Sequence, residues 1–143
     1  MSQYGLNIIL LPFKNSSGAA FLHLSGNIPR NCRELTSRRV QVFRPSRIAR
    51  TISEKYNIPR VAMTMRTVKS ASRNLWQGFY LDNGRPYFSR EYEMEIIERV
   101  GGGDCFSAGL IFGLSKGWNG EKCVQFAAAA SCLKHSVPGD FPI

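Results

Sequence analysis

The stretch Val100-Gly101-Gly102-Gly103-Asp104-Cys105-Phe106-Ser107-Ala108-Gly109 decides which fold this sequence predicts. It joins residues 95–100, which we expect to form a short strand, to residues 105–116, whose apolar spacing is helical. Glycines between a strand and a helix let the backbone turn tightly, so that several amide N–H groups point at one spot. The start of the helix adds its dipole to these donors. The pattern therefore predicts a phosphate-binding turn.

Asp104 follows the three glycines, and two interpretations of it are open. It stands where a helix N-cap belongs, and aspartate is favoured at that position. A carboxylate beside a phosphate site can also accept the proton of an attacking hydroxyl group. The stretch has neither the Gly-Lys-Ser/Thr ending of a P-loop nor the third glycine of a dinucleotide-binding fingerprint. Those two kinds of phosphate site are therefore not indicated.

The composition is that of a folded, soluble chain. Its 143 residues contain 43% hydrophobic and 20% charged amino acids, which is enough apolar surface for one buried core. The longest apolar run, residues 8–13, is far shorter than the roughly 20 residues that span a bilayer. The start at Met1 lacks the basic segment of a secretory signal. We expect a cytoplasmic protein without a membrane partner.

The four cysteines follow no metal-binding or disulfide pattern. Cys32, Cys105, Cys123 and Cys132 contain no C-x-x-C pair. Ordinary thiols in a reducing compartment are the expected state, and we predict no metal site made by the protein.

The net charge of +9 comes mostly from the N-terminal third. Residues 1–50 hold eight lysines and arginines against one acid, Glu34. Such a cluster can bind nucleic acid, but no interleaved aromatic residues support that function here. A solvated basic face is the preferred interpretation.

Local patterns predict most of the remaining elements. Strands are expected at residues 6–11, 20–26, 60–66 and 75–81, with a hairpin turn of the Asn-Gly type at 82–85 and a returning strand at 86–89. Residues 30–55 are expected to be helical, broken near Pro45 and followed by a stop at 57–59. A last helix is expected at 121–134, where the small residues 127–131 would admit a second helix or a flat ligand.

The glycine stretch resembles the C-terminal signature of the ribokinase-like carbohydrate kinases. Three further segments, residues 61–66, 87–89 and 129–141, resemble the 2-dehydro-3-deoxygluconate kinases within that family. The resemblance is continuous from residue 52 to residue 143, and a weaker island lies at 20–36. It implies an α/β protein with a partial three-layer α/β/α fold, which holds the C-terminal nucleotide-binding part and lacks the lid. The implied division is a basic N-terminal segment, 1–51, and an ATP-binding part, 52–143.

The resemblance also implies a role for individual residues. Asp104 matches the catalytic base, which takes the proton of the sugar hydroxyl and so touches substrate. Gly101, Gly102 and Gly103 match the anion hole and the ATP-phosphate contacts. Thr64 and Arg66 match the lining of the nucleotide site, and Asp140 matches a second substrate contact. ATP and Mg²⁺ are the implied cofactors, and a keto-deoxy sugar acid is the implied substrate.

The chain departs from the family in what it lacks. It is well under half the length of a typical member. Where the family has further strands of its parallel sheet, this chain has the segment 37–47. Glu98 stands where an aspartate is usual. Three functions stay open: a sugar kinase, an inactive kinase remnant, and a basic nucleic-acid-binding module. We expect weak or no kinase activity from this chain alone, and association through exposed sheet edges is a further alternative.

Overall fold

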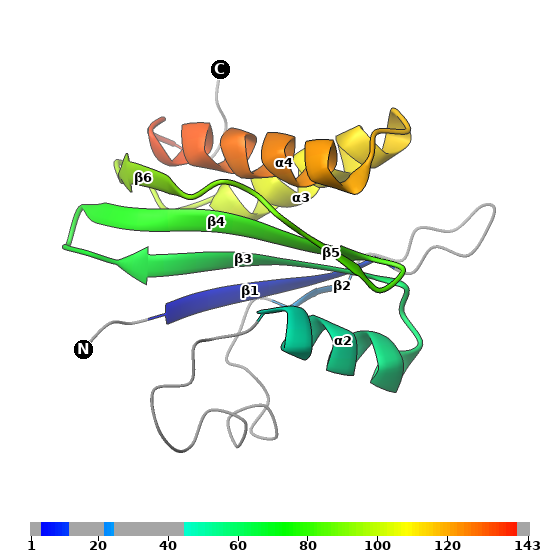
Figure 1. Cartoon of the computed structure of the whole chain (residues 1–143). Coiled ribbons are helices and arrows are strands. Elements are labelled where there is room, and N and C mark those ends of the chain that lie inside the picture. Colours follow the sequence, from blue (N-terminus) through cyan, green and yellow to red (C-terminus); the bar gives the residue numbers. More distant parts are fainter. Residues whose placement is uncertain (1–3, 12–21, 25–44, 140–143) are drawn as a thin grey trace, which may run out of the picture.

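A computed structural model describes residues 4–11, 22–24 and 45–139. The elements run β1 (Tyr4–Leu11), β2 (Leu22–Leu24), α2 (Pro45–Tyr56), β3 (Arg60–Val68), β4 (Arg73–Asp82), β5 (Arg85–Phe88), β6 (Tyr92–Glu95), α3 (Gly102–Ser115) and α4 (Gly120–His135). The strands form one sheet with the order β2-β1-β3-β4-β5, and β6 also pairs with β4. Helices α3 and α4 cover one face of this sheet and α2 lies on the other (Figure 1).

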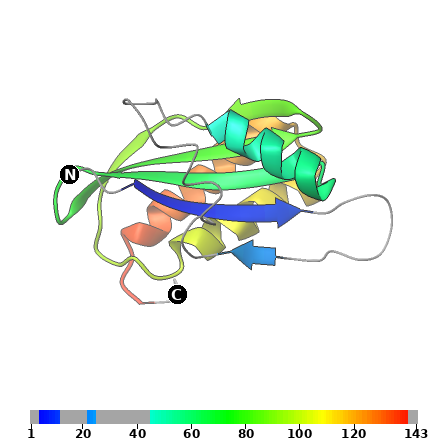
Figure 2. The ribbon, with the colours of Figure 1, turned by 90° about the horizontal axis from the view of Figure 1, so that it is seen from below.

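The three layers follow from the pattern of the two central strands. Side chains alternate between the faces of a strand, so a strand covered on both sides is apolar at successive positions. In β3, Val61 and Met63 pack with Ile48 and Ala49 of α2. Ala62, between them, packs with α3 and α4. The predicted three-layer α/β/α arrangement is confirmed, and the view from below shows α2 in front of the sheet with α3 and α4 behind it (Figure 2).

The core between the sheet and the C-terminal helices is built on aromatic and small residues. Tyr80 and Phe106 are fully buried in it. Gly109 of α3 allows the close approach of α4, because an added Cβ would lie 3.0 Å from the Cα of Ala127. The small residues of α4 therefore serve helix packing at Ala127, as one of the two sequence interpretations predicted.

Turn residues set most boundaries where the sequence predicts them. Asn83 and Gly84 have φ angles of 48° and 83°, the left-handed pair that a two-residue hairpin between β4 and β5 requires. Helix α2 begins at Pro45 and ends before Asn57, which has a φ of 51°. Gly117, with a φ of 70°, follows the end of α3. Helix α2 also continues across residues 51 and 52, where the resemblance implies a boundary between the N-terminal segment and the ATP-binding part.

Two expectations about strands are wrong. The resemblance predicts a parallel sheet, whereas every pairing among the described strands is antiparallel. Residues 95–100 were expected to be a strand, but β6 ends at Glu95. The amides of Ile97 and Glu98 instead donate to the carbonyl oxygen of His135 at 3.0 and 3.2 Å. The end of α4 thus takes the hydrogen bonds that a neighbouring strand would have used.

Candidate functional site

The glycine turn lies at the start of α3, as predicted, but the helix begins earlier than expected. Gly101 is the N-cap, with a left-handed φ of 80°, and its carbonyl oxygen accepts from Cys105 N at 2.9 Å. Gly102 and Gly103 are therefore already helical. In a helix, the first amides have no partner within the helix, so those of this turn are donors suited to an anion.

Asp104 is not the N-cap, which corrects one of its two interpretations. It lies in the first turn of α3, and no side-chain hydrogen bond caps this helix. The Asp104 side chain is exposed to solvent. A negative charge in the first turn is favoured by the helix dipole. The carboxylate thus stands beside the amides of the turn with no capping hydrogen bond.

Helix α4 fixes the backbone of the turn from the side. Ser131 Oγ donates to the carbonyl oxygen of Gly102 at 2.7 Å in a buried hydrogen bond. The ring of His135 lies against Gly102, where an added Cβ would be 2.6 Å from Nε2. His135 is itself 4% exposed and its ring packs on that of Trp76, with 4.8 Å between the ring centroids. Glycine is therefore required at position 102 by the packing of His135.

The residues before the turn are held by local hydrogen bonds. The Glu98 carboxylate accepts from the amides of Arg99 and Val100 at 2.8 and 3.2 Å. These two hydrogen bonds lower the pKa of Glu98. Arg99 Nη2 donates to the carbonyl oxygen of Ala71, in the connection between β3 and β4, at 2.9 Å. Glu98 thus stabilises the segment that leads into the glycine turn.

Thr64 and Arg66 lie on β3 at different depths. Both follow Ala62 at alternate positions and so face α3 and α4. Thr64 pairs with Gly78 and is 1% exposed. Arg66 is partly buried and pairs with Trp76, whose ring contacts His135. The structure therefore brings Arg66 toward the glycine turn and buries Thr64 deeper beneath the helices; the nucleotide contacts of both stay predictions.

Positive charge gathers around the His135 ring. Burial lowers the pKa of His135, and the charges of Lys134, Arg66 and Arg99 lower it further. Burial also lowers the pKa of Arg66, as does the charge of Arg99. The hydrogen bond to Ser131 opposes this lowering of the His135 pKa. The ring thus lies among three cationic side chains, an environment that favours an anion.

Several polar atoms near this site are buried without a hydrogen-bond partner in the described part of the chain. They are Arg66 Nε, Trp76 Nε1 and both amide atoms of Asn74. Asn74 is fully buried and lies two residues before Trp76 on β4. Three of the four atoms are donors, in keeping with the donor-rich character of the glycine turn.

Asp140, the predicted second substrate contact, lies outside the described residues. The segment leading to it is anchored by Lys134, whose Nζ donates to the carbonyl oxygen of Gly139 at 2.6 Å. Within the described ranges, no three His, Cys, Asp or Glu side chains are grouped so that they could hold a metal ion. Cys105, Cys123 and Cys132 are free thiols.

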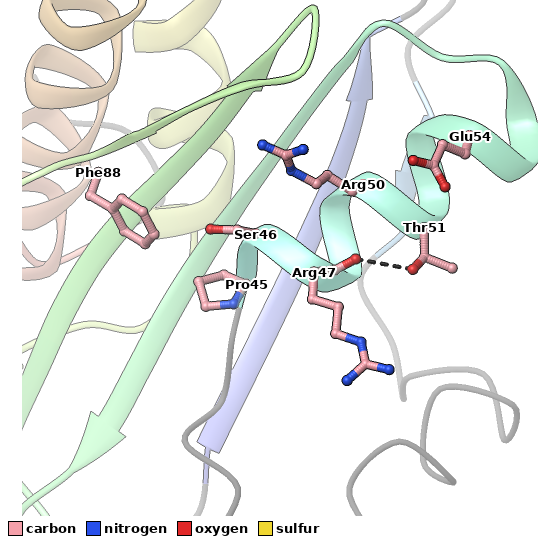
Figure 3. Close-up of a pocket in the computed structure, with 7 residues that line it drawn as sticks. All are labelled: Pro45, Ser46, Arg47, Arg50, Thr51, Glu54 and Phe88. Carbon is pink, nitrogen blue, oxygen red and sulfur yellow. Dashed lines mark hydrogen bonds between the residues drawn. The ribbon is translucent and has the colours of Figure 1, made fainter.

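An open hollow of about 670 Å³ lies on the other side of the molecule, against α2. Arg47, Arg50 and Glu54 line it together with Phe88 (Figure 3). Arg50 Nη2 also donates to the carbonyl oxygen of Gly84 at 3.1 Å. Arg47 and Arg50 belong to the cluster of eight lysines and arginines in residues 1–50, and the other six lie outside the described residues. The hollow is separated from the glycine turn by the sheet.

Comparison with known proteins finds a carbohydrate-kinase family over the C-terminal part of the chain. Residues 78–141, which include the glycine turn and both C-terminal helices, match the model of the pfkB family carbohydrate kinases. Over these residues the chain is similar to the pfkB carbohydrate kinases. A solved 2-dehydro-3-deoxygluconokinase from Thermotoga maritima is 46% identical, with a TM-score of 0.66 over 68% of this chain and 30% of that one. A pfkB family carbohydrate kinase from Listeria grayi is 36% identical, with a TM-score of 0.62 over 71% of this chain and 32% of that one.

The curated proteins that this chain resembles are named after a different keto-deoxy sugar acid. The 5-dehydro-2-deoxygluconokinase of Geobacillus thermodenitrificans is 32% identical over 66 residues, which are 44% of this chain and 20% of the relative. That of Clostridium perfringens is 26% identical over the same shares. This chain thus spans about a third of the solved pfkB kinases and a fifth of the curated relatives. No helix in the described ranges is long and apolar enough to cross a membrane.

The structure adds residues that sequence reasoning did not select. His135 and Ser131 contact Gly102, and Trp76 packs on the ring of His135. Arg99 joins Arg66 among the positive charges that lower the pKa of His135. A signal existed for two of them, because His135 and Ser131 lie within the segment 129–141 that resembles the kinase family. Nothing local to the sequence indicated that the ring of His135 lies on Gly102.

Proposed function

We propose that this chain carries the nucleotide-binding part of a sugar kinase that transfers the γ-phosphate of ATP to a hydroxyl group of a keto-deoxy sugar acid. The observation that carries the proposal is the glycine turn at the start of α3, with an exposed carboxylate in the same helical turn. The relatives named after 2-dehydro-3-deoxygluconate support this substrate. Those named after 5-dehydro-2-deoxygluconate support the same chemical class.

The proposed chemistry assigns one step to each group. The Asp104 carboxylate accepts the proton of the sugar hydroxyl as its oxygen attacks the γ-phosphorus, and ADP leaves with the electrons of the broken P–O bond. The amides of Gly102 and Gly103 donate to the oxygens of the transferring phosphoryl group. Arg66 adds positive charge beside the phosphates. These roles need the substrate's hydroxyl and phosphate to meet in line beside Asp104.

The residues present fit a Mg²⁺ ion that arrives with the nucleotide. Magnesium is commonly bound by one or two carboxylates together with substrate phosphates, and keeps several waters. The phosphates of ATP and water would hold the ion at the turn, so no cage of three side chains is needed and Asp104 keeps its role as the proton acceptor. The bound ion would offset the negative charge that develops on the phosphates.

Nucleotide binding without turnover is the second candidate function. It is favoured by the residues that match the family model, 78–141, which hold the glycine turn and the two C-terminal helices. Catalysis requires the sugar to be held and water to be excluded, and the groups assigned here serve the phosphate side of the reaction. Under this alternative, Mg-ATP binds to the turn but no phosphate is transferred.

Calorimetric titration of the full chain with Mg-ATP, followed by an assay of phosphate transfer, tests both candidates. Each sugar acid, 2-dehydro-3-deoxygluconate and 5-dehydro-2-deoxygluconate, is offered separately. Asp104→Asn should lower the transfer rate about 10²–10⁴-fold while Mg-ATP still binds. Glu121→Gln removes the acidic residue in the first turn of α4 and is the matched control.

The possible results separate the candidates. Transfer that depends on Asp104 and not on Glu121 supports the kinase. Mg-ATP binding without transfer to either sugar acid leaves the binding function and rejects the kinase. A chain that does not bind Mg-ATP contradicts both.

A further inference from the structure

We propose that His135 is a positioning residue, whose ring holds the Gly102 backbone so that the amides of the glycine turn stay directed at the phosphate. The identity of the anion rests on the proposed function, whereas the positioning of the turn does not. The inference concerns a side chain 4% exposed at the end of α4, with no part in the chemistry assigned above.

The ring has one orientation that satisfies its contacts. His135 Nδ1 lies 2.7 Å from the carbonyl oxygen of Ser131, so Nδ1 carries the hydrogen and donates it. This leaves Nε2 and Cε1 directed at Gly102, as the near overlap with an added Cβ there shows. On its other side the ring packs against Trp76, which is also 4% exposed. The imidazole is therefore held between Gly102 and β4.

The same residue also holds the chain that enters the turn. The carbonyl oxygen of His135 accepts from the amides of Ile97 and Glu98. Ser131, one helical turn earlier, donates to the carbonyl oxygen of Gly102. The last turn of α4 thus holds residues 97–102 by hydrogen bonds to three main-chain groups, the amides of Ile97 and Glu98 and the carbonyl oxygen of Gly102, and by the contact of the His135 ring with Gly102.

A held turn matters because glycine is flexible. Three successive glycines have wide conformational freedom, and an anion hole works when its donors are fixed before the ligand arrives. Gly101 and Gly103 have no side chains with which to limit that freedom. The ring on Gly102 supplies the restraint from outside the turn, so loss of the ring should loosen the amides and weaken the binding of a phosphate group.

Two variants separate the ring from its hydrogen bond. His135→Asn keeps an N–H donor for the Ser131 carbonyl oxygen and removes the ring; His135→Phe keeps a ring and removes the donor. Leu133→Ala, at a side chain 68% exposed on the same helix, is the matched control. The readouts are ¹⁵N order parameters of the Gly102 and Gly103 amides in the free chain and the Kd for Mg-ATP, at a temperature where each variant is fully folded.

We expect His135→Asn to lower the order parameters of the two amides from about 0.85 to below about 0.6. The same variant should weaken Mg-ATP binding about tenfold or more, because misplaced donors lose affinity. His135→Phe should keep most of the rigidity, and Leu133→Ala should match the wild-type chain in both readouts. A residue that served only the stability of the core would change the unfolding free energy and leave the folded amides rigid.

Equal order parameters in His135→Asn and Leu133→Ala would overturn the proposal. If the wild-type chain does not bind Mg-ATP, the proposed function fails, and the order parameters of the free chain alone decide the inference. If His135→Asn does not fold, a nuclear Overhauser contact between the His135 ring and the Gly102 α-hydrogens of the wild-type chain is required, and its absence overturns the inference.

Discussion

The contact between Gly102 and His135 makes a quantitative prediction for Gly102→Ala. An alanine Cβ at this position would lie 2.6 Å from Nε2 and 3.0 Å from Nδ1 of His135. Forcing a methyl group into a packed site costs about 1–3 kcal/mol. The backbone is no obstacle, because Gly102 is helical and its φ is not positive. Because alanine also adds about 0.5–1 kcal/mol of helix stability, the variant should lower the free energy of unfolding by up to about 2.5 kcal/mol.

The same substitution should have a different effect once the ring is removed. In a His135→Ala background the methyl group finds space, and replacing a helical glycine by alanine adds about 0.5–1 kcal/mol of stability. The effect of Gly102→Ala should thus change from destabilising to neutral or stabilising. This difference is the coupling energy that a double-mutant cycle measures.

Urea unfolding, followed by far-ultraviolet circular dichroism, gives the four free energies of the cycle. A Leu133→Ala background is the control, because Leu133 is on the same helix and exposed. There, Gly102→Ala should cost as much as in the wild-type chain. The reasoning is refuted if Gly102→Ala costs the same in the His135→Ala background as in the other two.

Two further predictions concern the same site. Gly101→Ala should lower the unfolding free energy by about 1–2 kcal/mol, because Gly101 has a left-handed φ of 80°. Gly101→Asn should lower it by less, since asparagine tolerates that conformation. Urea unfolding measures both variants, and equal stability of the two would contradict this prediction. The pKa of His135 is lowered from 6.5 by burial and by the charges of Lys134, Arg66 and Arg99, so the unfolded chain binds the proton more tightly than the native one. The contribution of His135 to stability should therefore be fully present above about pH 6.5 and be lost as pH falls toward the native pKa. Thermal unfolding should detect this loss in the wild-type chain and not in His135→Phe.

Much of the fold could be predicted because its signals are local. The Asn83-Gly84 hairpin, the start of α2 at Pro45 and the glycine after α3 each depend on backbone conformations within a few residues. The two buried central strands follow from their apolar runs. Residues 95–100, with three apolar side chains among six, are predicted to form a strand. Ile97 and Val100 are nevertheless exposed, and the amides of Ile97 and Glu98 bond to α4 and not to a strand.

Sequence patterns predicted the glycine turn of the candidate site, whereas they did not predict the residues of α4 that contact it. Three glycines and an aspartate are by themselves a weak signal for a phosphate turn, and the resemblance of the flanking residues to the carbohydrate kinases strengthens it. Which residue caps the helix could not be predicted, because Asp104 and Gly101 are both acceptable N-caps, and packing decides between them. With Ser131 and His135 beside it, Gly102 lies in the helix and Gly101 takes the capping position.

The sequence by itself therefore determined the glycine turn, the two helices that follow it and the hairpin between β4 and β5, because glycine, proline and asparagine act on the backbone at their own positions. The tertiary structure alone decided what holds the turn in place. Ser131 lies 29 residues from Gly102 along the chain, and the two meet because α3 and α4 pack against each other through small residues. A contact of that kind depends on how two helices dock, and no local pattern in the sequence records it.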